Sequence, residues 1–229
     1  MRKVWSSLFH LIYPRLCVLC KDMLTEGEEQ ICLSCLERLP RTLFYHRKDN
    51  PVSQHFSAIL PIVHATAFFH YQKGNEMTLL SYSFKYGKNK RLAYLLGRQA
   101  ALELELQHTA YESVDMLIPV PLHPKREKKR GYNQSEWICM GLSSVWNIPI
   151  QTDILLRCVQ TQTQTNKTVY KRWSNTQNAF DLKNEEMLQG RHVLLVDDVI
   201  TTGSTLVACT KTLLRVPDVR VSLFGLSIA

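Results

Sequence analysis

Residues 192–206 read H-V-L-L-V-D-D-V-I-T-T-G-S-T-L, and this stretch determines the fold that we expect. The four apolar residues at 193–196 are typical of a strand buried on both faces of a parallel sheet. Two carboxylates, Asp197 and Asp198, come directly after them. In an open α/β sheet, ligands bind in the crevice outside the carboxyl end of such a strand. The sequence therefore predicts an α/β fold with a parallel sheet flanked by helices, and a ligand site at the end of this strand.

The turn after the two carboxylates has the residue types of a phosphate site. It contains hydroxyl side chains and one glycine, namely Thr201, Thr202, Gly203, Ser204 and Thr205. A helical pattern follows, and the start of a helix offers free N–H groups and a partial positive charge to a phosphate. Carboxylates repel a phosphate, but they suit sugar hydroxyls or a divalent cation shared with the phosphates. We therefore expect a phosphorylated sugar with Mg²⁺.

Other motifs with similar elements fit this stretch less well. A Walker loop requires G-x-x-x-x-G-K-[ST] and a dinucleotide site requires G-x-G-x-x-G, whereas this turn has one glycine and no lysine. A receiver domain of a response regulator is excluded because too few residues follow Asp198. A plain strand–helix turn explains the hydroxyl groups but not two acids at the end of a buried strand.

The stretch closely resembles the loop that binds 5-phosphoribosyl 1-pyrophosphate (PRPP) in type I phosphoribosyltransferases. The shared pattern is four apolar residues, two acids and T-T-G-x-T. The resemblance implies that Asp197 and Asp198 hold the ribose hydroxyls and Mg²⁺, and that residues 201–205 hold the 5′-phosphate.

The net charge of the chain favours anionic binding partners. The chain has 229 residues, of which 45% are hydrophobic, enough for one large or two modest domains. Its formal net charge of +8 favours phosphates, nucleic acid or an acidic membrane surface as partners. No apolar run approaches the ~18 residues of a transmembrane span. Residues 1–14 predict an amphipathic helix rather than a signal peptide, so we expect a cytoplasmic protein.

Two C-x-x-C pairs predict a structural zinc site. The four residues are Cys17, Cys20, Cys32 and Cys35. Two residues between thiolates let both sulfurs face one metal, and two such pairs complete a tetrahedral Cys₄ site. A redox motif normally has one such pair, and disulfides need an oxidising compartment. The remaining cysteines are expected in the core, and they are Cys139, Cys158 and Cys209.

A second cationic segment follows the strand that we expect at 114–120. Residues 125–130 include five basic side chains and one acid, and a helix is expected from Gly131 to Trp146. A strand that ends in a cationic loop before a helix predicts another anion site. A solvated run of charges is the alternative.

The wider segment 119–134 carries the pattern P-V-P-L-H-x-x-R-x-x-x-R-G-Y-N-Q, and residues 84–87 read F-K-Y-G. Together they make the chain similar to the ComF (competence protein F) family, in which an N-terminal Cys₄ motif precedes a phosphoribosyltransferase-like domain. The resemblance covers the chain from about Pro14 onwards. It implies PRPP binding and a role in uptake of single-stranded DNA during natural transformation, in association with the membrane DNA-uptake machinery. A nucleobase phosphoribosyltransferase of salvage or biosynthesis is the alternative.

The same resemblance implies a mobile lid over the ligand. Residues 160–168 contain no apolar side chain and lead into further cations. An exposed β-hairpin is the alternative for this segment. The cations expected to meet the pyrophosphate are Arg126, Arg130, Lys171 and Arg172.

The complete expectation has two parts. Residues 1–57 form an N-terminal helix, a zinc ribbon and a polar connector, and residues 58–229 form the phosphoribosyltransferase-like domain. The expected strands of the parallel sheet are 114–120, 154–159, 192–197 and 219–226, with strand character also at 58–71 and helices at 76–86 and 90–107. Single-stranded DNA is expected on a basic surface that includes the ribbon or its connector, with 85–91 and 125–130 as further candidates. Phe84, Tyr86 and Tyr132 are candidates for stacking on bases.

Overall fold

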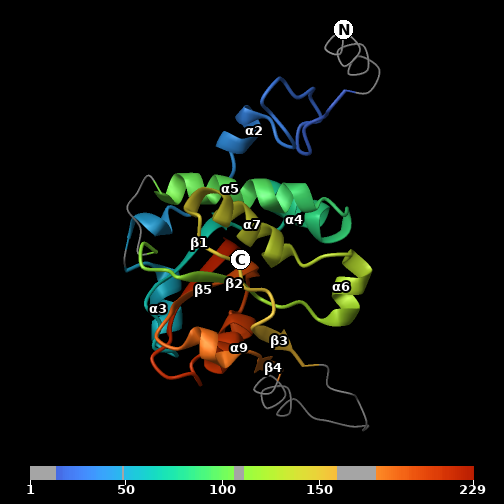
Figure 1. Ribbon diagram of the computed structural model, residues 1–229. Helices are drawn as coiled ribbons and strands as arrows, with labels where there is room; N and C mark the ends of the chain where they lie inside the picture. Colours follow the sequence, from blue (N-terminus) through green and yellow to red (C-terminus); the bar gives the residue numbers. More distant parts are fainter. Residues whose placement is uncertain (1–13, 48, 106–110, 159–178) are drawn as a thin grey trace, which may run out of the picture.

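A four-stranded parallel sheet forms the centre of the molecule in the computed structural model, which describes residues 14–47, 49–105, 111–158 and 179–229 (Figure 1). The strand order is β1-β6-β5-β2, and every neighbouring pair is parallel. The strands are β1 (Ala65–His70), β2 (Met116–Pro119), β5 (His192–Ile200) and β6 (Arg220–Ile228). The predicted fold class is confirmed.

The central strand β5 is longer than predicted. It continues through the acid pair to Ile200, because β6 pairs with it as far as Ile200↔Ile228. Asp197 and Asp198 are therefore strand residues, held in a hydrogen-bonded ladder rather than in a loop.

The prediction that residues 154–159 form a strand of the parallel sheet is wrong. The strand there, β3 (Leu155–Arg157), pairs antiparallel with β4 (Phe180–Leu182) in a separate two-stranded sheet. At the outer edge of β2, the described part of the chain makes a single parallel bridge, Leu117↔Ile150. The place in the central sheet is taken by β1, for which only strand character was predicted.

One face of the sheet is covered by three helices. They are α4 (Glu76–Tyr86), α5 (Lys90–Glu105) and α7 (Gln134–Trp146), and they lie above the sheet in Figure 1. Leu194 and Val196 of β5 share their core. α5 and α7 pack so closely that a Cβ atom at Gly97 or Gly141 would collide with backbone of the other helix. The prediction of α4 is confirmed to the residue, and α5 begins where predicted.

The opposite face is covered by α3, α9 and the β3–β4 pair. The helices are α3 (Pro51–Ser57) and α9 (Ser204–Leu213), and short 3₁₀ turns lie at Phe44–His46 and Glu185–Leu188. Val193 and Leu195 of β5 belong to this second core, as does Phe56 of α3. The interpretation of 36–57 as a plain polar connector is therefore wrong for α3. The buried side chain of Asn50 caps this helix, because its Oδ1 accepts from the backbone N–H groups of Val52 and Ser53.

The cysteine-rich ribbon stands on the helical face, next to α4 and α5 (Figure 1). It includes the short helix α2 (Leu33–Glu37). Its buried Ile31 and Leu39 belong to the same core as Phe68 of β1. At the rim, Glu29 pairs with Arg91 of α5 at 2.7 Å. The division at residue 57 stays a prediction. Among the described residues, no helix is both long enough and apolar enough to cross a membrane.

Candidate functional site

The acid pair lies at the carboxyl end of β5, where two helices begin nearby. Alternation along the strand directs Asp197 toward the α9 face and Asp198 toward the α4 face. Asp197 Oδ1 accepts hydrogen bonds from the backbone N–H of Asp198 at 2.8 Å and from Ser135 Oγ at 3.4 Å. Burial and the neighbouring charge of Asp198 raise the pKa of Asp197 to about 7. The site thus holds a carboxyl group whose ionisation is opposed by its surroundings, which is typical of functional sites.

Asp198 is paired with a lysine that the sequence did not assign to it. Lys85 Nζ lies 3.1 Å from Asp198 Oδ2, and the two side chains are 20% and 15% exposed. Lys85 belongs to α4, so a residue more than one hundred positions earlier in the chain completes this part of the site. We predicted Lys85 in the nucleic-acid cluster at 85–91, and this contact corrects that assignment. The F-K-Y-G element was the signal that could have shown its place.

A second cation lies in the β3–β4 pair, which covers the α9 face of the sheet. Arg157 of β3 is half-buried, and its guanidinium lies 5.2 Å from the centroid of the Phe180 ring. Burial lowers the pKa of Arg157, and the charge of Arg126 adds to this effect, whereas Asp197 acts in the opposite direction. The electrostatic surroundings of Arg157 therefore include Asp197 and Arg126, the second of which is a predicted pyrophosphate ligand. Sequence reasoning missed Arg157 because it was an isolated cation in a short strand.

The predicted phosphate loop lies directly beside the acid pair. Gly203 has a φ of 70° and precedes the first turn of α9. A Cβ atom there would lie 2.7 Å from Cζ of Phe56, so both the backbone conformation and the space require glycine. Ser204 N donates to Thr202 Oγ1 at 3.4 Å, which shapes the turn. One small hollow is lined by the loop and by one carboxylate of the pair, through Asp197, Val199, Ile200, Thr201, Gly203, Ser204, Thr205 and Leu206.

The predicted cationic loop at 125–130 is a short helix instead, α6 (Pro124–Arg130). Proline at the first turn, a histidine cap and a left-handed Gly131 at the end define it, and these are standard helix boundaries. None of its side chains is buried. Arg130 donates to Gln134 Oε1 at 2.6 Å and lies 5.5 Å from the centroid of the Tyr86 ring. Lys171 and Arg172, and the predicted lid at 160–168, lie outside the described residues.

The R-G-Y-N-Q segment connects three elements around the site. The hydroxyl of Tyr132 donates to the carbonyl of Phe84 in α4. Asn133 donates to the carbonyl of Val120 at 3.0 Å, and its Oδ1 accepts from Ser135 N at the start of α7. The segment therefore fixes α4, the end of β2 and the start of α7 relative to one another. Burial raises the pKa of Tyr132 to about 12, which keeps its hydroxyl a donor.

The four predicted metal ligands come together in the ribbon. The sulfurs of Cys17, Cys20, Cys32 and Cys35 all lie within 4.8 Å of one another. Cys20 Sγ and Cys32 Sγ are 3.7 Å apart, close to the roughly 3.8 Å between sulfurs that surround a zinc ion at ~2.3 Å.

Backbone and side-chain donors point at these sulfurs. Burial opposes ionisation of Cys17, but backbone hydrogen bonds from Cys32, Cys20 and Leu19 lower its pKa to about 6. Arg38 Nη2 donates to Cys35 Sγ at 3.3 Å. The cluster could therefore hold a metal ion through thiolates. Of the other cysteines, Cys139 and Cys209 are buried as predicted, whereas Cys158 is exposed.

Comparisons with known proteins agree with this arrangement. Residues 151–220 match the family model described as a phosphoribosyl transferase domain. Competence protein F of Haemophilus influenzae is 39% identical over 142 residues, which are 61% of this chain and 59% of that protein. The chain is a homologue of competence protein F.

The chain is also similar to two further proteins. The DNA utilization protein YhgH of Escherichia coli O157:H7 is 36% identical over 141 residues, 61% of each protein. Competence protein ComFC of Bacillus subtilis is 32% identical over 100 residues, 44% of this chain and 38% of that protein. The matched segment thus spans about three fifths of the YhgH and competence protein F sequences, at 61% and 59%.

Similarity to solved structures is weaker. A glutamine PRPP amidotransferase from B. subtilis, complexed with ADP and GMP, has a TM-score of 0.44 and 18% identity. The match covers 63% of this chain and 30% of that one, too slight to carry an argument about the site.

Proposed function

We propose that this competence protein F homologue binds PRPP at the carboxyl end of β5 and acts in the handling of single-stranded DNA during DNA uptake. The observation that carries the proposal is the hollow shared by Asp197 and the Gly203 turn at the start of α9. A helix start with hydroxyl side chains suits the 5′-phosphate, and carboxylates beside it suit ribose hydroxyls.

Different charged groups around the hollow are proposed to bind different parts of PRPP. Asp197 and Asp198 accept hydrogen bonds from the ribose, and they supply the oxygen ligands that Mg²⁺ prefers. Arg126 and Arg130 on α6, with Lys171 and Arg172, are proposed for the pyrophosphate. Mg²⁺, when bound, would neutralise charge on the pyrophosphate as it leaves the ribose.

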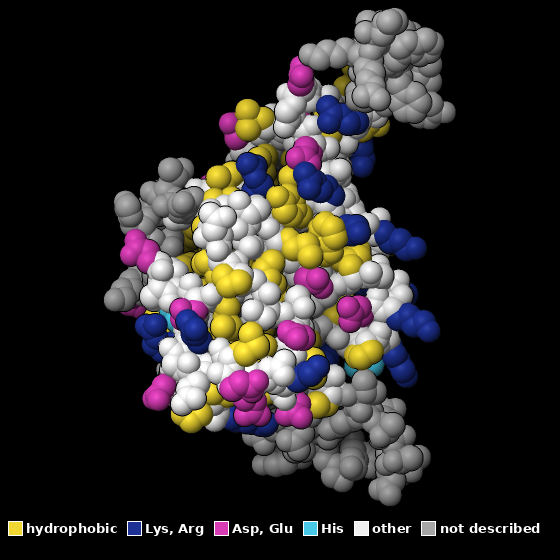
Figure 2. All heavy atoms as spheres, in the orientation of Figure 1, with side chains coloured by type: hydrophobic (Ala, Val, Ile, Leu, Met, Phe, Trp, Pro, Cys, Tyr) yellow, Lys and Arg dark blue, Asp and Glu magenta, His cyan; other side chains and the backbone are white. Residues whose placement is uncertain are grey.

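The names of the relatives support a role with DNA, because they are called competence and DNA utilization proteins. The described surface offers a cationic and aromatic region that fits this role. Tyr82 and Tyr86 of α4 are 66% and 58% exposed, and their ring centroids are 5.0 Å apart. Figure 2 shows Lys and Arg side chains projecting at the right-hand edge, where α6 lies. Cations beside exposed aromatic rings suit the phosphates and bases of a single strand.

Two residues predicted for DNA binding have to be set aside, and a third, Arg91, is engaged in an exposed ion pair. Phe84 is buried, at 1% exposure, so it cannot stack on a base. Lys85 and Arg91 are paired with Asp198 and Glu29. We therefore place the DNA surface on α6 and on the exposed tyrosines of α4, and no longer on the whole of 85–91.

The cysteine cluster is proposed to hold one structural Zn²⁺. All four ligands come from the protein, which leaves no open position for catalysis. A zinc site of this kind needs free cysteines rather than disulfides. Because free cysteines are typical of the cytosol, the proposed site also favours a cytoplasmic location. Association with the membrane DNA-uptake machinery is part of the same proposal.

The second candidate is a nucleobase phosphoribosyltransferase, because the same loop would serve transfer of the phosphoribosyl group.

Titration calorimetry with PRPP, with and without Mg²⁺, tests PRPP binding, which both candidates share. We expect binding by the wild type and at least a tenfold loss in Asp197→Asn/Asp198→Asn, because charge-assisted hydrogen bonds are about twice as strong as neutral ones. Asp218→Asn is the control, because Asp218 is exposed in the turn before β6, at the end of the sheet opposite to the acid pair. Equal affinities in all three proteins would refute the site. Pyrophosphate release with a nucleobase, without DNA binding at low salt, would favour the enzyme.

A further inference from the structure

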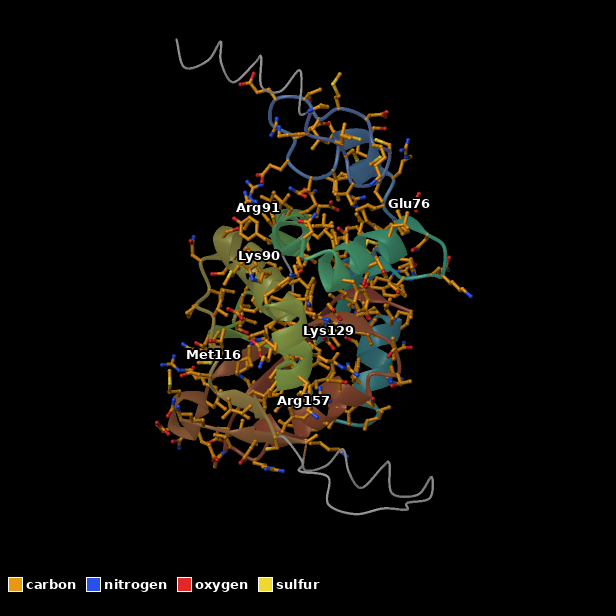
Figure 3. The ribbon with its side chains drawn as sticks, turned by 90° about the vertical axis from the view of Figure 1, so that its right-hand side faces the viewer. Glu76, Lys90, Arg91, Met116, Lys129 and Arg157 are labelled. Carbon is orange, nitrogen blue, oxygen red and sulfur yellow. The ribbon has the colours of Figure 1, made fainter. Side chains whose placement is uncertain are left out.

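Lys85 stands where a divalent cation would be expected beside the acid pair. Its Nζ lies 3.1 Å from Asp198 Oδ2, a normal distance for a charged hydrogen bond. Figure 3 shows α4, which begins at the labelled Glu76 and carries Lys85, in the upper part of the view, with Lys129 and Arg157 labelled below it. An ammonium group therefore already compensates the carboxylate that was predicted to meet Mg²⁺.

The backbone that carries Lys85 is firmly held, so this contact differs from a loose surface ion pair. Phe84, the preceding residue, is buried, and its carbonyl accepts from the Tyr132 hydroxyl. At the other end of α4, Asn75 caps the helix by accepting from Thr78 N at 3.1 Å. The Lys85 side chain itself is only 20% exposed. Little solvent is therefore available to screen the pair.

The charge of Asp198 is compensated without a metal. Lys85 pairs directly with Asp198, and its charge also lowers the pKa of Asp197, against the larger opposing effects of burial and of the Asp198 charge. A divalent ion bound directly to Asp198 would lie within a few ångströms of the Lys85 ammonium and would be repelled by it.

We propose that Lys85 occupies the cation position beside Asp198, so that the protein takes up Mg²⁺ only together with PRPP. This inference rests on the proposed PRPP site, and it adds an order of binding to it. Lys85 acts through Asp198 as a positioning residue, keeping that carboxylate directed at the position of the ribose hydroxyls. When PRPP brings Mg²⁺ on its pyrophosphate, the added negative charge offsets the repulsion between the metal and Lys85.

The test is Mn²⁺ binding, measured by electron paramagnetic resonance on full-length, zinc-loaded protein without PRPP. Wild type, Lys85→Arg and the control Lys73→Met should show no site at the acid pair. Lys85→Met removes the charge while keeping a long helix-forming side chain, and it should gain one Mn²⁺ site, about tenfold or more tighter than any in wild type. The gained site should disappear in Lys85→Met/Asp198→Asn. Lys73 is an exposed lysine in the turn before α4, so its variant matches the change of net charge.

Equal Mn²⁺ affinity in wild type and Lys85→Met would overturn the inference, and so would a gained site that persists without Asp198. Should Lys85→Met fail to fold, Lys85→Gln replaces it, with circular dichroism as the check on folding. Calorimetry with PRPP separates a failure of the role proposed for Lys85 from a failure of the proposed PRPP site. Wild type that binds PRPP but also binds Mn²⁺ at Asp198 contradicts only the role of Lys85. Wild type that binds no PRPP at any Mg²⁺ concentration contradicts the proposed function, whatever the Mn²⁺ result.

Discussion

At the scale of single residues, Gly203 is required twice, once for its positive φ and once for the space next to Phe56. Gly203→Ala should destabilise the fold by about 2–4 kcal/mol, because it adds a collision to the roughly 1–2 kcal/mol of a left-handed non-glycine residue. Gly190→Ala is the matched control, since Gly190 has a φ of 68° but nothing within 4 Å of its Cβ position. Urea unfolding of both variants isolates the Phe56 contact. Equal losses would show that Phe56 yields to the added methyl group.

Asp197 gives the site a predictable pH dependence. Its pKa is raised from 3.8 to about 7 in the folded protein, so the folded state prefers the protonated form. The resulting stabilisation is complete below about pH 3.8 and is lost as pH rises through 7. Asp197→Asn should therefore be more stable than wild type at pH 8, by about 1–4 kcal/mol, with the difference shrinking toward pH 4. Urea unfolding of the two proteins at each pH, without metal or PRPP, measures this difference, and a constant difference would contradict the assignment.

The residues that the sequence revealed and those that it hid differ in a simple physical way. Asp197, Asp198 and Gly203 are neighbours in the chain, so one local pattern showed their purpose. Lys85 reaches Asp198 only through the packing of α4. Arg157 joins the electrostatic surroundings of Asp197 only through the packing of β3. A lone cation in a sequence carries no sign of which carboxylate it will meet.

At the scale of elements, the ribbon depends on its metal ligands. It is short, and its few buried side chains include two of the cysteines, Cys17 and Cys35. Cys32→Ser should abolish zinc binding, because a Cys₄ site is lost when one ligand is removed. Metal analysis of the purified protein should give about one zinc in wild type and none in the variant. Cys158→Ser, the same change at an exposed cysteine, should retain the metal. Zinc retained in Cys32→Ser would contradict the site.

Secondary structure was predictable where periodicity was long and ambiguous where it was short. The eleven residues of α4 carry an apolar stripe, Asn75 directly before them caps the helix, and the predicted bounds matched the observed ones. The apolar residues near 155 form only a three-residue strand, and so short a run does not reveal its pairing partner. The partner, β4, begins only at Phe180, more than twenty residues later, so nothing local indicated an antiparallel pair. α3 carried a local signal that the prediction did not use. Asn50 and Pro51 form a helix start, and Val52 and Phe56 are spaced four apart, as on one face of a helix, but the helix has only seven residues.

At the scale of the whole molecule, the two proposed ligands use neighbouring but separable surfaces. PRPP lies at the end of β5, whereas DNA would lie on α6 and the exposed face of α4. Arg126 and Arg130 could serve either ligand, so a clean test leaves them unchanged. Lys125, Lys128 and Lys129 are exposed on α6 and lie outside the proposed pyrophosphate set.

Reversing these three charges to glutamate should weaken binding of single-stranded DNA and spare PRPP. Each lost phosphate contact should reduce the slope of log affinity against log salt by about 0.7.

Tyr82→Ala and Tyr86→Ala should each cost about 1–3 kcal/mol of DNA binding while leaving the salt slope unchanged, because stacking on bases releases no counterions. The control reverses three other exposed cations, Lys183, Lys211 and Arg215, which lie on or beside β4 and α9. Fluorescence anisotropy across a salt series measures both quantities. If the control weakens DNA binding as much as the α6 variant does, then net charge alone attracts DNA, and α6 with its neighbouring tyrosines is not the binding surface.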